Sequence, residues 1–89
     1  MNSHITSKFR KAFRKLSREE QEQARRAYRL FIKNSRHPSL KFKPINSTHS
    51  VYSVRISLDY RALGSRDGDE IVWFWIGSHA EYDKILRAF

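Results

Sequence analysis

The fold of this chain is decided by a stretch near its C-terminal end that reads IVWFWIGSHAEY, from Ile71 to Tyr82. Its first six residues are all apolar, and an apolar run of this length predicts a central strand that is covered on both faces. Ser78 and Glu81 then have the spacing of a capping box, in which each side chain bonds the backbone amide of the other residue. A last helix is therefore expected to begin near His79, directly beyond the end of the strand.

Before this strand, the chain alternates between apolar and polar residues, which is the period of a half-buried strand. Three more strands are predicted, over Leu40–Lys43, Tyr52–Leu58 and Tyr60–Leu63, with a polar turn at residues 46–50 and a hairpin turn at Gly64–Asp69. The alternation directs an apolar set toward one face: Phe42, Val54 and Ile56. It directs a basic set toward the other face: Lys41, Lys43, Arg55 and Arg61.

The first third of the chain has the helical period instead. Apolar residues near helical spacing predict a helix over Ile5–Leu16. A second capping box, formed by Ser17 and Glu20, predicts a helix over Arg18–Lys33. We therefore expect a single α+β domain over residues 1–89, in which a two-helix hairpin packs on one face of a mostly antiparallel four-stranded sheet and a short helix ends the chain.

Composition limits the function classes. The chain of 89 residues has no cysteine, and no apolar run reaches the length of a membrane span or a signal peptide, so a cytoplasmic protein is expected. The net charge is +9, and it is uneven: residues 1–43 hold thirteen Lys and Arg against three Glu, whereas residues 44–89 hold five against six acidic residues. Such a field attracts polyanions, either nucleic acid or an acidic protein partner.

Arg55 and Arg61 are the first candidates for a functional site. Arginines on the open face of a sheet can hold phosphates in a fork of donors and stabilise the charge that builds on a cleaved phosphate. The alternative is a solvated strand face, or ion pairs with Asp59 or Asp69.

His79 is the sharpest single candidate, because it lies in the first turn of the expected last helix. The positive end of a helix disfavours a second proton on the ring, and a neutral imidazole can act as a general base on a ribose 2′-hydroxyl. A surface histidine at a helix start is the alternative. Tyr82 can stack on a base or belong to the core, and Glu81 is explained more simply by the cap.

Basic residues elsewhere are candidates for binding RNA phosphates. Lys41 and Lys43 can extend a phosphate track, although edge strands also carry lysine to block aggregation. Arg25 and Arg29 on the second helix can dock RNA. Trp73 and Trp75 are predicted to point the same way, for core packing or for stacking on bases. Four histidines without cysteine at these spacings do not predict a metal site, and no cofactor is expected.

Three segments carry a resemblance to a known family: VYSVRI at residues 51–56, DYRAL at 59–63 and IVWFWIGSHAEYD at 71–83. Together they resemble the RelE/ParE superfamily of bacterial toxins, which belong to type II toxin–antitoxin modules. The resemblance covers nearly the whole chain and is strongest over residues 38–86. It implies a cognate antitoxin that is at least partly acidic.

The resemblance implies two different activities. RelE-like members are ribosome-dependent mRNA endonucleases that use basic residues on the sheet, with a C-terminal His or Tyr in some branches, whereas ParE-like members inhibit DNA gyrase and cleave nothing. Arg55 and Arg61 match the basic positions, and His79 and Tyr82 lie where the C-terminal residue is expected. We favour the nuclease, acting on mRNA at the ribosome without a metal. Gyrase inhibition, or a basic RNA- or protein-binding domain of the same fold, are the alternatives.

Overall fold

The computed structural model describes residues 1–45 and 50–88 of the chain, and the polar turn predicted at residues 46–50 falls largely outside them. In these residues the elements follow one another as β1 (Asn2–Ile5), α1 (Ser7–Arg14), α2 (Arg18–Lys33), the 3₁₀ helix η1 (Pro38–Leu40), β2 (Lys43–Pro44), β3 (Val51–Arg55), β4 (Tyr60–Asp67), β5 (Glu70–Ser78) and α3 (His79–Arg87). The strands form one sheet in the order β1-β5-β4-β3-β2. Every pairing in it is antiparallel except that of β1 with β5, which is parallel.

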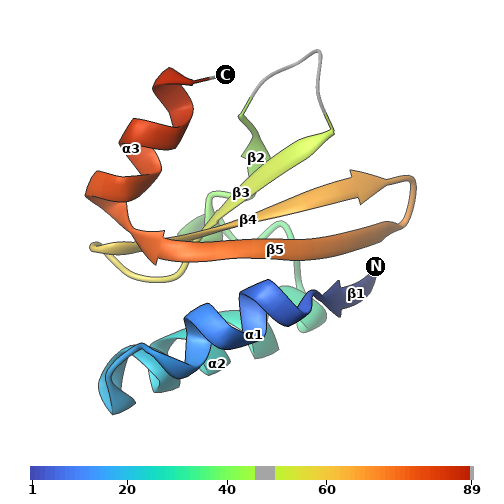
Figure 1. The fold of residues 1–89 in the computed structure, drawn as a ribbon. Coiled ribbons are helices and arrows are strands. Elements are labelled where there is room, and N and C mark those ends of the chain that lie inside the picture. Colours follow the sequence, from blue (N-terminus) through green and yellow to red (C-terminus); the bar gives the residue numbers. More distant parts are fainter. Residues whose placement is uncertain (46–49, 89) are drawn as a thin grey trace.

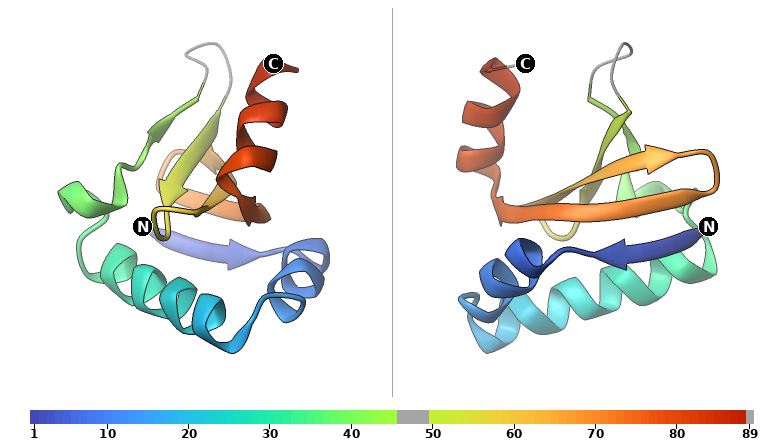
Figure 2. Two further views of the ribbon diagram at one scale, coloured as in Figure 1. Left: turned by 90° about the vertical axis from the view of Figure 1, so that its left-hand side faces the viewer. Right: turned by 45° about the vertical axis from the view of Figure 1, so that its right-hand side comes forward.

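The helices lie on both sides of this sheet. The hairpin of α1 and α2 covers one face, and α3 stands on the other (Figure 1). We call these the helix-pair face and the outer face. Figure 2 shows that α1 and α2 diverge beneath the sheet and that β1 runs along the sheet edge on the helix-pair side. The predicted α+β architecture is therefore confirmed, with one more strand than expected.

Helix boundaries follow the caps that the sequence contains. The box of Ser17 and Glu20 begins α2, which spans Arg18–Lys33 as predicted. The box of Ser78 and Glu81 begins α3 at His79, also as predicted. Each pair satisfies two backbone amides that a helix start leaves without partners, so these local signals are strong enough to fix the boundary.

The helix predicted over Ile5–Leu16 is wrong at its N-terminal end. Residues from Asn2 to Ile5 form an edge strand, and α1 begins only at Ser7, after Thr6 caps it by accepting a hydrogen bond from the Phe9 amide at 3.0 Å. The strand exists because it pairs with β5, a partner almost seventy positions away that a local pattern cannot reveal.

The predicted strand over Leu40–Lys43 is also wrong. Pro38–Leu40 forms a 3₁₀ turn, Lys41 adopts a left-handed conformation with φ of 46°, and only Lys43 and Pro44 pair with β3. Leu40 is fully buried, so a turn rather than a strand brings this side chain into the core. Lys41 consequently does not belong to the row of basic side chains on the sheet.

The hairpin before β5 is longer than predicted. Strand β4 continues to Asp67, and the turn is confined to Gly68 and Asp69, where Gly68 has a positive φ of 60°. Strand β3 is shorter than predicted and ends at Arg55. Strand β5 lies between β1 and β4 and is therefore an inner strand, as its apolar composition indicated.

A β-bulge separates the two tryptophans of β5. Leu63 pairs with Trp75, but the next residue, Gly64, pairs with Trp73, so Phe74 is an extra residue on this strand. Trp73 therefore faces α2, where its ring meets Phe31 edge-on at 5.3 Å between centroids. Trp75 shares the outer face with Leu63. The prediction that both rings point the same way is wrong, because the bulge inverts the alternation between them.

Candidate functional site

The two arginines of the sheet lie directly opposite each other. Arg55, the last residue of β3, pairs with Arg61 of β4, and Arg61 pairs in turn with Gly77 of β5. Cross-strand partners share a face, so both guanidinium groups belong to the outer face, as predicted. Both side chains are half-buried, and their like charges oppose each other across one strand pair. An anion between or above them would offset that repulsion.

Arg61 is held in place by the loop between β3 and β4. Its Nη1 atom donates to the backbone carbonyls of Ser57 at 2.6 Å and Tyr60 at 2.9 Å. Burial and the neighbouring charge of Arg55 lower the pKa of the Arg61 guanidinium. An arginine remains charged under these conditions, so the arrangement fixes a cation at the end of the strand. The Nη1 atom of the guanidinium bonds the loop, and the other N–H groups of Arg61 can donate to a ligand.

His79 lies at the same end of the sheet. It follows β5 directly, and its backbone amide donates to the Asp59 carbonyl at 2.6 Å, which ties the start of α3 to the loop that Arg61 also holds. The Nδ1 atom of His79 lies 3.1 Å from Oδ2 of Asp83, one turn later on α3. A proton on Nδ1 that bonds this carboxylate leaves Nε2 as the acceptor, which is the arrangement a general base requires.

Tyr82 is largely buried beneath α3. It is 8% exposed, and its ring lies edge-on to that of His79 with 6.0 Å between centroids. The ring therefore supports the imidazole and helps to anchor α3 on the sheet. Glu81 acts as the cap residue: its Oε1 atom accepts from the backbone amide of Ser78 at 3.3 Å.

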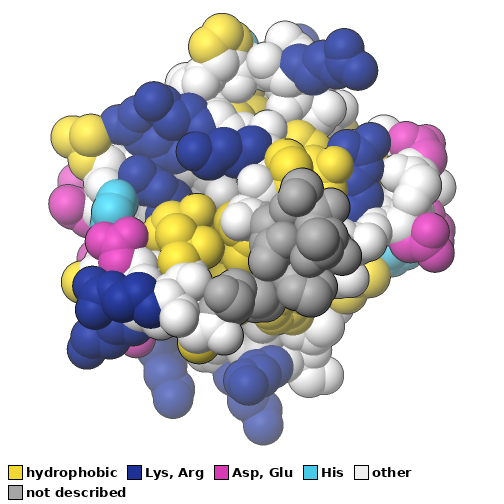
Figure 3. Space-filling model, turned by 90° about the horizontal axis from the view of Figure 1, so that it is seen from above, with side chains coloured by type: hydrophobic (Ala, Val, Ile, Leu, Met, Phe, Trp, Pro, Cys, Tyr) yellow, Lys and Arg dark blue, Asp and Glu magenta, His cyan; other side chains and the backbone are white. Residues whose placement is uncertain are grey.

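The remaining predicted residues divide between the two faces. Lys43 pairs with Ser53 and thereby joins the outer face at its far edge, whereas Lys41 lies in the turn outside the strand. Figure 3 looks down on the outer face, where Lys and Arg side chains surround exposed hydrophobic groups and a histidine adjoins acidic side chains. The outer face therefore combines fixed cations, a histidine and apolar surface.

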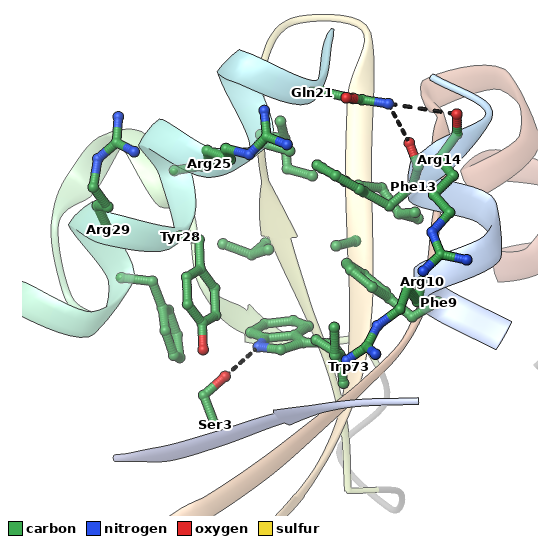
Figure 4. A pocket seen from close by; sticks show the side chains of 18 residues that line it. Ser3, Phe9, Arg10, Phe13, Arg14, Gln21, Arg25, Tyr28, Arg29 and Trp73 are labelled. Atoms are coloured by element: carbon green, nitrogen blue, oxygen red, sulfur yellow. Dashed lines mark hydrogen bonds between the residues drawn. The ribbon is translucent and has the colours of Figure 1, made fainter. Parts of the chain in front are cut away.

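Arg25 and Arg29 lie on the other side of the sheet, at an apolar groove between α1 and α2. The groove has a volume of about 710 Å³, and its floor is formed by core side chains such as Phe31 and Trp73. Arginines from both helices line it, namely Arg10 and Arg14 of α1 and Arg25 and Arg29 of α2 (Figure 4). The Arg25 guanidinium lies over the Phe13 ring, 5.2 Å from its centroid. These arginines are thus separated from the predicted catalytic residues by the sheet.

The closed end of this groove is fixed by one side chain. Gln21 Nε2 donates to the carbonyls of Phe13 at 3.2 Å and Arg14 at 3.4 Å (Figure 4), and also to the carbonyl of Leu16 at 3.2 Å. These carbonyls lie at the C-terminal end of α1, where the helix leaves acceptors without partners. The two helices are therefore joined near their connection and open toward the other end.

A family model for the ParE-like toxin domain matches residues 18–84. The chain belongs to this family. The model covers α2, the antiparallel strands and most of α3, which includes both outer-face arginines and His79. No curated protein matches this ParE-like toxin domain in sequence.

Solved structures agree on the fold of the toxin domain. YafQ from E. coli strain BL21(DE3) superposes with a TM-score of 0.71 at 13% identity, covering 91% of this chain and 96% of YafQ. A YoeB/ParE toxin from Agrobacterium tumefaciens gives 0.68 at 14% identity over 89% and 99%. A chain of the RelB-RelE antitoxin-toxin complex from Methanococcus jannaschii gives 0.68 at 18% identity over 92% and 96%. The fold is therefore that of the RelE/ParE superfamily.

Two features of the toxin domain escaped the sequence reasoning. Asp83 is not among the predicted site residues, although a spacing of four residues on a helix places its side chain on the same face as that of His79. The loop carbonyls that hold Arg61 carry no sequence signal, because any residue supplies one. Within residues 1–45 and 50–88 of the toxin domain, no helix has the length and apolar character needed to cross a membrane.

Proposed function

We propose that this chain is the toxin of a type II toxin–antitoxin module and that it cleaves mRNA on the ribosome, in the cytoplasm. The observation that carries the proposal is the common position of three side chains at one end of the sheet. Arg55 and Arg61 oppose each other on adjacent strands, and His79 follows the neighbouring strand with Asp83 at its Nδ1 atom.

This arrangement suits cleavage by the RNA's own 2′-hydroxyl. His79 Nε2 takes the 2′-hydroxyl proton, and the 2′-oxygen forms a bond to the adjacent phosphorus. The bond from phosphorus to the 5′-oxygen breaks, which leaves a 2′,3′-cyclic phosphate and, after that oxygen takes a proton from water, a 5′-hydroxyl. Arg55 and Arg61 stabilise the charge that builds on the phosphate. Tyr82 positions the imidazole through its ring contact.

The antitoxin is proposed to occupy the groove between α1 and α2. Several relatives of known structure were determined with antitoxins, among them the E. coli DinJ-YafQ complex. In the present chain the groove joins an apolar floor to an arginine rim, which is complementary to an amphipathic segment with acidic flanks. Lys43, Arg25 and Arg29 then have separate tasks: Lys43 extends the phosphate track on the outer face, and the two arginines face the antitoxin or ribosomal RNA.

The proposal is tested by primer extension on a reporter mRNA, with purified protein added in parallel to translating ribosomes and to naked RNA. We expect new 3′ ends only in the reaction with ribosomes. Replacing Arg55 by alanine should reduce these new 3′ ends, because Arg55 stabilises the charge on the phosphate. Among the described residues no hydrogen bond joins the Arg55 side chain to the loop between β3 and β4, so this variant should keep the fold. If the protein arrests growth but the mRNA stays intact both with translating ribosomes and as naked RNA, the nuclease proposal is refuted.

A second candidate function is inhibition of DNA gyrase. The observation that favours it is the match to the ParE-like family model over residues 18–84. A gyrase inhibitor needs no proton transfer, so replacing His79 by alanine would leave growth arrest intact. A supercoiling assay with purified gyrase decides between the two, because loss of supercoiling in the absence of RNA cleavage establishes the second function.

A further inference from the structure

A second hollow lies where the sheet ends beside α2. Its volume is about 430 Å³, within the range of small-ligand sites. It is lined from α2, from η1 and from the end of β3: Gln23, Arg26, Ala27, Leu30, Ser39, Leu40, Arg55, Ile56 and Ser57. Strand β2 pairs with β3 only at Tyr52 and Ser53, so within the described residues no strand pairs with β3 on this side from Val54 onward.

The lining divides into an apolar part and a polar part. Ala27, Leu30 and Ile56 are half-buried side chains that form an apolar wall. Two arginines, Arg26 and Arg55, line the same space from different elements. Gln23, Ser39 and Ser57 add neutral donors and acceptors. Among the described residues that line the hollow, none is acidic.

Arg55 connects this hollow to the outer face. Its register places it opposite Arg61, and its position at the end of β3 also places it in the lining of the hollow. A phosphate held by Arg55 would therefore stand between the outer face and the hollow. A nucleic-acid strand, which has one phosphate for each nucleotide, can therefore run from the outer face into the hollow while one of its phosphates contacts Arg55.

We propose that this hollow is a subsite for one nucleotide of an RNA strand, whose phosphate lies between Arg26 and Arg55 and whose base lies against Ala27, Leu30 and Ile56. Gln23 and the two serines, which both donate and accept, match the mixed polar edge of a base. An acidic peptide would need the cations but not these neutral groups. The inference extends the RNA path of the proposed function, but it concerns binding alone and needs neither ribosome nor cleavage.

The test is a titration of the full-length, ¹⁵N-labelled protein, observed through its backbone amides. The probes are adenosine 5′-monophosphate, adenosine, inorganic phosphate and a hexaglutamate peptide. We expect the nucleotide to shift amides around the hollow and to bind more tightly than either of its parts. Arg26→Ala should weaken its binding about tenfold, the effect of losing one charge-assisted hydrogen bond. Arg18→Ala is the matched control: it removes an equal charge from α2 outside both hollows and should leave binding within about twofold.

A second variant, Gln23→Leu, separates the base from the phosphate. This variant keeps every charge, so it should weaken the binding of adenosine 5′-monophosphate and leave the binding of inorganic phosphate unchanged. The proposal is overturned if Arg18→Ala and Arg26→Ala weaken binding equally, which would indicate diffuse attraction. It is also overturned if inorganic phosphate binds as tightly as the nucleotide, or if hexaglutamate displaces it from the same amides. Because no step involves cleavage, these outcomes do not depend on whether the toxin is a nuclease.

Discussion

The two faces of one sheet have opposite characters in this toxin domain. The helix-pair face contains the main core, in which Phe31, Trp73 and Ile76 pack together, and this core is built from apolar side chains. The outer face carries Arg55 and Arg61, and a single short helix covers part of it (Figure 1). The stability of the fold and its candidate chemistry are therefore placed on different sides of the same strands.

The β-bulge of β5 is what keeps this division intact. Without it, regular alternation would direct Trp73 and Trp75 to the same face. With it, Trp73 enters the core and is 3% exposed, while Trp75 remains half-buried on the outer face beside the arginines. A strand that is apolar throughout can serve two faces with different tasks because one extra residue resets its register.

Replacing each tryptophan by alanine should give the largest contrast. Trp73→Ala removes a buried ring that also donates from Nε1 to Ser3 Oγ at 3.0 Å, and should cost about 3–5 kcal/mol of unfolding free energy. Trp75→Ala removes a half-buried ring and should cost roughly 1–2 kcal/mol. Urea unfolding of both variants, followed by circular dichroism, measures the difference. Equal losses would mean that the two faces are equally important for stability.

The reverse contrast is expected for activity. In the ribosome-dependent cleavage assay, His79→Ala should lower the rate about 10²- to 10⁴-fold, the usual contribution of a general base. Asp83→Asn preserves the shape of the partner but removes its charge, and should lower the rate less, by roughly tenfold. Both side chains are substantially exposed, so the urea midpoints should change little. A cleavage rate unchanged by His79→Ala would remove this residue from the mechanism.

Two glycines allow the faces to be compared at the level of packing. A Cβ atom at Gly64 would lie 2.7 Å from Cε3 of Trp73, and one at Gly77 would lie 2.5 Å from Cζ2 of Trp75. The ring in the core cannot move, so Gly64→Ala should cost about 1–3 kcal/mol. The half-buried outer ring can swing away, so Gly77→Ala should cost less, although it should disturb cleavage because Gly77 neighbours Arg61. Urea unfolding and the cleavage assay together measure both effects.

The control for this pair is Gly68→Ala in the β4–β5 turn. Beyond the two neighbouring residues in the chain, no described atom lies within 4 Å of the added Cβ there, so the expected cost is that of the positive φ, about 1 kcal/mol. Cleavage should be unaffected, because the turn is at the opposite end of the strands from Arg61. If Gly64→Ala costs no more than this control, the core around Trp73 is loosely packed.

How far the sequence could predict this molecule depended on the distance over which each signal acts. The caps of α2 and α3 are formed by residues three positions apart, and both boundaries were predicted. The pairing of Arg55 with Arg61 follows from two adjacent strands and was predicted as a common face. The parallel strand Asn2–Ile5 depends on a partner far along the chain, and its few residues carry no pattern of their own.

The candidate site was predictable in its residues but not in its contacts. Arg61 and His79 stood out by residue type and position, whereas their partners are a set of loop carbonyls and one carboxylate one turn later on α3. Backbone carbonyls are common to all residues, so only the folded loop shows which ones converge. The separation of Arg25 and Arg29 from the sheet arginines likewise required the structure, because charge alone does not reveal which face a helix covers.

The smallest expected effect concerns a link between the helix pair and the start of β4. Hydrogen bonds from the Ser17 amide and from the Tyr60 hydroxyl lower the pKa of Glu20. A lowered pKa in the folded protein stabilises it above the ordinary value for glutamate, and this contribution is lost as the pH falls through the folded pKa. Glu20→Gln should therefore lower the melting temperature slightly at neutral pH. The difference from the unmodified protein should shrink as the pH falls below the ordinary pKa of glutamate, about 4.3, and through the lower folded value.

Tyr60→Phe tests which hydrogen bond matters, because it removes the hydroxyl and leaves the capping box of Ser17 intact. The bond to Glu20 raises the pKa of Tyr60, so its stabilising effect is present below about pH 10 and is lost as the pH rises through the folded pKa. Melting temperatures of both variants, measured from pH 2.5 to 11, follow the loss of the Glu20 contribution in acid and the loss of the Tyr60 contribution in base. A Glu20→Gln difference that persists unchanged in acid would mean that the charge of the carboxylate is irrelevant to this contribution.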